Sequence, residues 1–142
     1  MSSILKISDA ATLALHAMVY LAANTDRLVS TGEIAGVIKV SENHLSKVLQ
    51  RLHRAGLVKS IRGPKGGFAL EKPSDEVMLL EIFEVIEGQL TDSNCLLAIQ
   101  ICDGKKCIMG GLLDSINKQV KNHLSGTNLT ELIDIFGGKK DG

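Results

Sequence analysis

The segment from residue 57 to residue 70 constrains the fold most, because it predicts a β-hairpin directly behind a helix. Leu57–Arg62 alternates as a half-buried strand does, and Phe68–Leu70 can return beside it. The connection, with the sequence GPKGG at residues 63–67, is rich in residues that permit the unusual backbone angles of a turn. Arg62 and Lys65 therefore sit at a narrow, glycine-rich and basic hairpin tip.

Two short helices are predicted immediately before the hairpin. Ser30 and Glu33 have the spacing of a capping box, which marks the start of a short helix. Lys39-Val40 then makes a turn, and Ser41 caps a second helix over residues 42–55. Two short helices joined by a tight turn form the helix-turn-helix pattern, although an ordinary helical hairpin has the same signature. The basic hairpin behind them favours the first interpretation and predicts a winged helix.

The charge distribution agrees with a nucleic-acid partner even though the formal net charge is zero. From Lys39 to Lys65 there are seven lysines and arginines against one acid, and from Glu71 to Asp92 seven acids against one base. The neutral total therefore conceals a basic segment followed by an acidic segment. The alternative for the hairpin tip is the phosphate-binding loop of an enzyme, but the Walker spacing and the strand-to-helix transition are missing. We also find no paired carboxylates and no nucleophile triad, so we expect a protein that is not an enzyme.

The second helix and the hairpin tip supply the candidate DNA contacts. Side chains near the N-terminus of such a helix point into the major groove, where polar groups can hydrogen-bond to base edges. Residues at the cap or farther along the helix are expected to touch phosphates, and a basic wing tip can enter a minor groove. The alternative is a solvated polar surface. The predicted DNA-binding residues are Ser41, Asn43, Ser46, Lys47, Arg51, Arg62 and Lys65.

The rest of the chain predicts further helices around an aliphatic core, since aromatic residues make up only 3% of the sequence. Behind the hairpin, a helix is expected over residues 77–87 and a longer one over 111–125. The longer helix carries a narrow apolar seam that suits a partner helix, although it could instead fold back on its own head. We expect a mainly α fold with a small β-hairpin wing: a winged helix-turn-helix DNA-binding domain over residues 1–74, a sensor loop and dimerisation helices over 75–136, and a flexible tail over 137–142.

Three cysteines, Cys95, Cys102 and Cys107, lie within thirteen residues, and the chain has no others. No targeting signal and no apolar stretch long enough to span a bilayer precede them, so we expect a cytoplasmic protein with no membrane partner. In a reducing compartment, thiols are more often ligands or reactive groups than disulfides. Thiolates gathered on one loop can close around a soft metal or an iron–sulfur cluster.

The order of these parts resembles the IscR/NsrR-type (Rrf-two) family of bacterial winged-helix regulators over nearly the whole chain. The similarity rests on LKISDAATLALHAMVYLA at residues 5–22, on STGEIAGVIKVSENHLSKVLQRLHRAGLVKSIRGPKGGFAL at 30–70 and on LLEIFEVIEG at 79–88. The resemblance implies a homodimeric transcriptional regulator that binds a double-stranded DNA operator. Many members hold a [2Fe-2S] or [4Fe-4S] cluster on three loop cysteines, which correspond here to Cys95, Cys102 and Cys107. Such a cluster would sense redox state, nitric oxide or Fe–S status.

This chain departs from the family pattern around the cysteines. Their spacing is less even than is usual in cluster-binding members, and the first gap, residues 96–101, is unusually apolar. Some members use a histidine three residues after the last cysteine, where this chain has Gly110. In other members the fourth ligand comes from the first helix of the partner subunit, which here favours His16, with Asp9 as the alternative. A histidine packed in the core is the competing interpretation, and zinc or a bare thiol switch could replace the cluster.

Overall fold

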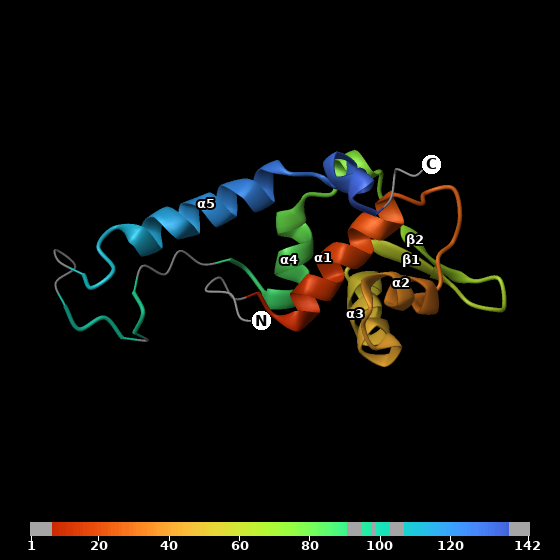
Figure 1. The fold of residues 1–142 in the computed structure, drawn as a ribbon, viewed down its shortest axis with the longest axis horizontal. Coiled ribbons are helices and arrows are strands. Elements are labelled where there is room, and N and C mark those ends of the chain that lie inside the picture. Colours follow the sequence, from red (N-terminus) through yellow and green to blue (C-terminus); the bar gives the residue numbers. More distant parts are fainter. Residues whose placement is uncertain (1–6, 91–94, 98, 103–106, 137–142) are drawn as a thin grey trace.

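The computed structural model describes residues 7–90, 95–97, 99–102 and 107–136, and Figure 1 shows its arrangement. The elements are α1 (Asp9–Ala22), α2 (Thr31–Ile38), α3 (Glu42–Arg54), β1 (Val58–Ile61), β2 (Gly67–Leu70), η1 (Ser74–Glu76), α4 (Leu79–Glu87), α5 (Leu112–Gly126) and η2 (Leu129–Phe136). The mainly helical fold with one β-hairpin confirms the predicted class. No helix among the described residues is long and apolar enough to cross a bilayer. The predicted tail, residues 137–142, lies outside the described part.

The helix-turn-helix forms because each helix has its own start and stop signal. The Ser30 hydroxyl accepts from Glu33 N at 3.1 Å, and the Ser41 hydroxyl accepts from His44 N at 3.2 Å. These bonds satisfy amides that have no partner within the helix. Between the helices, Lys39 takes a left-handed conformation with φ of 60°, which ends α2 and makes the tight turn. The predicted turn at Lys39-Val40 is therefore confirmed.

The wing is held to the body by a third backbone segment. β1 and β2 pair antiparallel, with Val58 opposite Leu70 and Ile61 opposite Gly67. Val29, in the connection between α1 and α2, then exchanges two hydrogen bonds with Phe68, at 2.9 and 2.7 Å. A lone two-stranded hairpin is marginally stable in water. This bridge and the burial of Phe68 therefore fix the wing on the head.

One aliphatic core underlies the whole head, and α1 runs through its middle (Figure 1). Ala11, Ala14 and Ala17 are fully buried on one stripe of α1, so neighbouring elements can approach its backbone closely. Residues on both sides of the predicted domain boundary, such as Met18 and Ile82, belong to the same cluster. The division at residues 74 and 75 therefore remains a prediction about function rather than about separate cores.

α5 extends away from the head and returns to it at its C-terminal end (Figure 1). Leu79 N donates to Thr127 O at 3.0 Å and Leu129 N donates to Val77 O at 3.1 Å, which pins the end of α5 to the start of α4. The segment that follows is a 3-10 helix, η2. It begins with a reciprocal capping box, in which Asn128 and Glu131 each donate a backbone amide to the other's side chain.

A polar network fixes the corner between α1 and α2. The Arg27 guanidinium donates two hydrogen bonds to the Glu33 carboxylate, and the Tyr20 hydroxyl donates a third. Glu33 therefore does not return to the Ser30 amide, as a full capping box would require. The Arg27 bonds, followed by the Tyr20 bond, lower the pKa of Glu33 from its ordinary 4.5 to about 2. Burial first, and then the bond to Glu33, raises the pKa of Tyr20.

Replacing Gly67 with Ala should destabilise the wing. A Cβ atom at this position would lie 2.7 Å from Val29 O and 2.8 Å from Val29 C, where only backbone could give way. We expect a loss of at least about 2 kcal/mol in the free energy of unfolding, measured by urea denaturation. Gly36→Ala is the matched control, because its Cβ meets no described atom within 4 Å and alanine favours an α-helix. Equal stability of the two variants would contradict the bridge.

Replacing Glu33 with Gln should change stability in a pH-dependent way. Because the folded pKa lies below the unfolded one, the carboxylate stabilises the protein fully above a pH of about 4.5, and this contribution is lost as the pH falls toward about 2. The pair is partly exposed, so we expect a loss of only about 1 kcal/mol at pH 7. The difference from wild type should disappear in acid. Glu76→Gln, at an exposed site, is the control. If Glu33→Gln leaves the fall in unfolding free energy below a pH of about 4.5 unchanged, the network is contradicted.

Candidate nucleic-acid interface and cysteine segment

The outer face of α3 carries the predicted base-reading side chains. The apolar face of α3, Leu45, Val48, Leu49 and Leu52, is buried. This fixes the rotation of the helix, so Asn43 and Lys47 are exposed and Ser46 is half-buried on the other side. The structure therefore brings these three together near the start of the helix. The Ser41 hydroxyl already accepts as the cap, which leaves its proton to donate to a phosphate.

Arg51 has a partner within the protein. Its Nη2 donates to the backbone oxygen of Ile86, in the last turn of α4, at 2.8 Å. The prediction that Arg51 touches DNA phosphates is not tested by this contact, but the contact shows that the guanidinium joins α3 to α4. Sequence reasoning missed this role, because no local pattern connects residues 35 positions apart.

His53 is a second residue that sequence reasoning missed. Its Nδ1 lies 3.1 Å from the backbone oxygen of Val58. A carbonyl oxygen can only accept, so Nδ1 donates, and the bond ties the last turn of α3 to the first residue of β1. The recognition helix and the wing are thus connected by a side chain as well as by the chain itself.

The wing tip presents Arg62 and Lys65 to solvent. Its turn is closed by a hydrogen bond from Gly66 N to Gly63 O at 2.9 Å. At Gly66, a Cβ would lie 2.0 Å from Ile61 O, so the tight turn requires glycine at this position. The predicted minor-groove side chains therefore stand exposed on a narrow backbone loop.

The three cysteines line one pocket of about 210 Å³. Cys95 and Cys107 are half-buried and Cys102 is exposed, and the remaining walls are apolar: Leu96, Leu97, Ile101 and Ile108. Met109 N lies 3.4 Å from the Cys107 sulfur, as a donor to it. Within the described residues, no three histidine, cysteine or acidic side chains are grouped closely enough to hold a metal ion. The structure brings the cysteines to one place without forming a closed ligand set.

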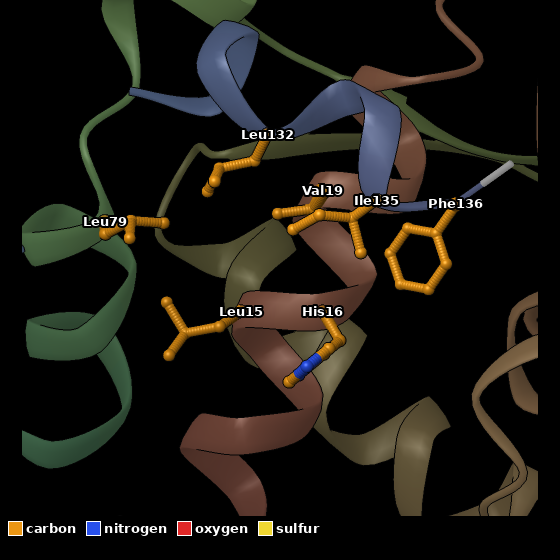
Figure 2. Close-up of a pocket in the computed structure, with 7 residues that line it drawn as sticks. All are labelled: Leu15, His16, Val19, Leu79, Leu132, Ile135 and Phe136. Atoms are coloured by element: carbon orange, nitrogen blue, oxygen red, sulfur yellow. The ribbon is translucent and has the colours of Figure 1, made fainter. Parts of the chain in front are cut away.

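His16 is exposed on α1 and faces a different pocket, of about 110 Å³ (Figure 2). Its Nδ1 lies 2.7 Å from Thr12 O, and its ring meets Phe136 edge to face at 6.5 Å between centroids. Since Thr12 O can only accept, Nδ1 carries a proton, and Nε2 of the neutral ring keeps a lone pair for a ligand. The histidine is not packed in the core. Asp9, the alternative, is exposed in the first turn of α1.

His16 and the cysteine pocket are not joined within one chain. The two pockets share no lining residue, and the described cysteine residues lie beyond the N-terminal end of α5, away from α1 (Figure 1). Among the described residues, the two pockets are therefore separate.

These features define a winged helix-turn-helix DNA-binding protein. The family model "Rrf2: Iron-dependent Transcriptional regulator" matches residues 7–135, and the chain belongs to this family. It is a transcriptional regulator rather than an enzyme, as predicted. An HTH-type transcriptional regulator of Aquifex aeolicus is 36% identical over 131 residues, covering 90% of this chain and 91% of that protein. BadM of Rhodopseudomonas palustris is 42% identical over 83 residues, covering 58% of this chain and 53% of BadM.

Solved structures agree with this assignment. CymR, the global cysteine regulator of B. subtilis, is 30% identical with a TM-score of 0.78, covering 94% of this chain and 100% of CymR. The oxidized form of Staphylococcus aureus CymR is 25% identical with a TM-score of 0.74, covering 97% and 100%. T. potens IscR shares the fold, with 24% identity and a TM-score of 0.74 over 98% and 95% of the two chains.

Lys47→Ala should weaken binding to the cognate operator by about 1–3 kcal/mol and relax preference at one base. We expect this because burial of the apolar face of α3 fixes the rotation of the helix and leaves Lys47 exposed on the opposite side. The measurement is a titration against an operator selected from random duplexes, at fixed salt. Lys118→Ala, on α5, is the control for loss of one positive charge. If Lys47→Ala loses equal affinity for operator and random DNA, Lys47 contacts only phosphate.

Proposed function

We propose that this regulator binds its operator as a homodimer and that its three cysteines set its affinity for DNA. The observation that carries the proposal is the single pocket that Cys95, Cys102 and Cys107 line, on the same chain as an exposed recognition helix and wing. We place the protein in the cytoplasm, where thiols stay reduced and an operator is accessible.

Recognition of DNA would use both parts of the head. Asn43, Ser46 and Lys47 would read base edges in the major groove, with Ser41 on a phosphate. Arg62 and Lys65 would enter the adjacent minor groove, where the negative potential is strongest over A·T-rich sequence. The His53 bond supports a concerted fit, because it holds the wing to α3.

The thiols would hold an iron–sulfur cluster, either [2Fe-2S] or [4Fe-4S]. The donor chemistry fits, since thiolate sulfur is the usual ligand of such clusters. The apolar walls, Leu96, Leu97, Ile101 and Ile108, are exposed in the described arrangement and would shield a cluster from water only after the segment closes. The described arrangement leaves the three sulfurs ungrouped, so binding would require this segment to close around the cluster. The cluster, when bound, would supply the sensitivity to oxidants or nitric oxide, and the chain would supply the ligands and the apolar wall.

A bare thiol switch is the alternative that the geometry also favours. Cys102 is exposed while its two neighbours are half-buried in the same pocket, an arrangement that allows oxidation of one thiol beside potential resolving thiols. The oxidized form of a 25% identical relative has been crystallised, which supports this alternative. Zinc is the third possibility for three cysteines and one histidine.

The dimer would pair through α5. Its exposed Leu112 and half-buried Leu113, Ile116 and Val120 lie on one side, while Leu124 is buried at the base against the head. Only the far part of the predicted seam is thus open to a partner. A partner's α1 could then bring His16, or Asp9, to the cysteine pocket as the fourth ligand.

Protein purified without oxygen should be coloured, with iron and sulfide in near-equal amounts. Cys→Ala at position 95, 102 or 107 should bleach it and move operator affinity to the apo value. Optical absorption and metal analysis are the measurements. Colourless protein with stoichiometric zinc would show that zinc, rather than a cluster, is bound. Metal-free protein whose DNA binding responds to peroxide would favour the thiol switch.

Mixed dimers should show whether His16 acts across the subunit interface. One chain carries His16→Ala, and the other carries Ala at all three cysteine positions. If His16 acts in trans, the mixed dimer keeps one complete site and about half of the wild-type colour. Purification through a different affinity tag on each chain establishes that the mixed dimer forms. A colourless mixed dimer would rule out the cross-subunit arrangement, and substitution of Asp9 in place of His16 tests the alternative ligand.

A further inference from the structure

The C-terminal end of α4 has no positive charge of its own. The sequence of α4, Leu79–Glu87, contains three glutamates and no basic residue. The last carbonyls of a helix lack intrahelical partners and carry partial negative charge, which nearby glutamates oppose and cations stabilise. Arg51, on the recognition helix, supplies both the missing donor and the missing cation through its 2.8 Å bond to Ile86 O.

The same end of α4 is a junction between several parts of the molecule. Gly88 N donates to Glu84 O at 2.9 Å, and Leu90 N donates to the Glu84 carboxylate at 3.0 Å. Ser8 N, at the cap of α1, lies 3.3 Å from the Glu87 carboxylate as a donor to it. The chain leaves this junction toward Cys95. This junction is therefore the described part of the head that directly precedes the cysteine segment in the sequence.

We propose that Arg51 is a positioning residue: it sets the orientation of α3 against α4 and transmits changes in the cysteine segment to the DNA-reading side chains. Only the transmission of changes from the cysteines rests on the proposed function. The positioning role does not, because the bond between Arg51 and Ile86 lies within the described chain. The guanidinium is well suited to this role, since its planar donor array fixes direction better than an ammonium group does. Arg51 would then contribute to operator binding without neutralising a phosphate.

The salt dependence of binding separates the two roles. Loss of one phosphate contact reduces the magnitude of the negative slope of log K against log salt by about 0.9. We expect Arg51→Met to leave this slope unchanged, to weaken operator binding about tenfold, and to leave binding to random duplex DNA unaltered. Arg54→Met is the matched control, because it removes the same charge from the same helix and the described part of the chain shows no bond from Arg54 to α4. A slope reduced by about 0.9, with equal losses on both DNAs, would overturn the proposal.

Hydrogen exchange tests the junction without DNA. Arg51→Met should speed exchange of the Gly88 and Leu90 amides, whereas Arg54→Met should not. Unchanged exchange at both amides would overturn the proposal. If Arg51→Met fails to fold, Arg51→Gln is used for the same measurements, because it is also neutral but keeps a donor. We then expect a partial loss of operator preference with the slope unchanged.

Transmission is tested with Ser at all three cysteine positions. In an otherwise wild-type chain this change should alter operator affinity, and in the Arg51→Met background it should not. An equal response in both backgrounds would overturn transmission through Arg51. No response in the wild-type background would refute the proposed sensing function instead, while the salt slope and the exchange rates would still decide the positioning role.

Discussion

The burial of α1 is the constraint on which the other parts of the head depend. Three fully buried alanines leave little side-chain bulk on one face of α1, so neighbouring elements can approach its backbone closely. Around α1 pack α3, α4, β2 and η2. The helix is consequently a common support for the elements that read DNA and for the helix that leads to the cysteines. Because protein interiors are close-packed and yield little, a shift of one element on this support is felt by the others.

Local elements of the fold were predictable from sequence because their signals are local. The caps at Ser30 and Ser41, the turn at Lys39 and the glycine-rich hairpin all appeared where the pattern placed them. Features that depend on distant residues were not predictable. The Val29–Phe68 bridge and the recruitment of Glu33 by Tyr20 and Arg27 both join segments that only the folded chain brings together.

The site shows the same division. The amphipathic pattern of α3 correctly predicted that Asn43 and Lys47 would be exposed, since burying one face determines the other, whereas Ser46 is half-buried. It could not show that Arg51 reaches α4 or that His53 reaches the wing, because charge and spacing look alike for a solvated cation and for a bonded one. The clustering of cysteines in sequence placed them on one segment, but the pocket that they line and the exposure of each thiol required the fold.

The tight turn at Gly66 limits how the wing can diverge among related regulators. Its missing side chain is required by the nearby Ile61 carbonyl, and Gly67 is similarly required by Val29. Substitution at these two positions would alter the loop itself, whereas the side chains of Arg62 and Lys65 are exposed to solvent. If the wing enters the minor groove as proposed, changes at those two exposed positions would alter what the wing contacts while the backbone of the turn keeps its shape.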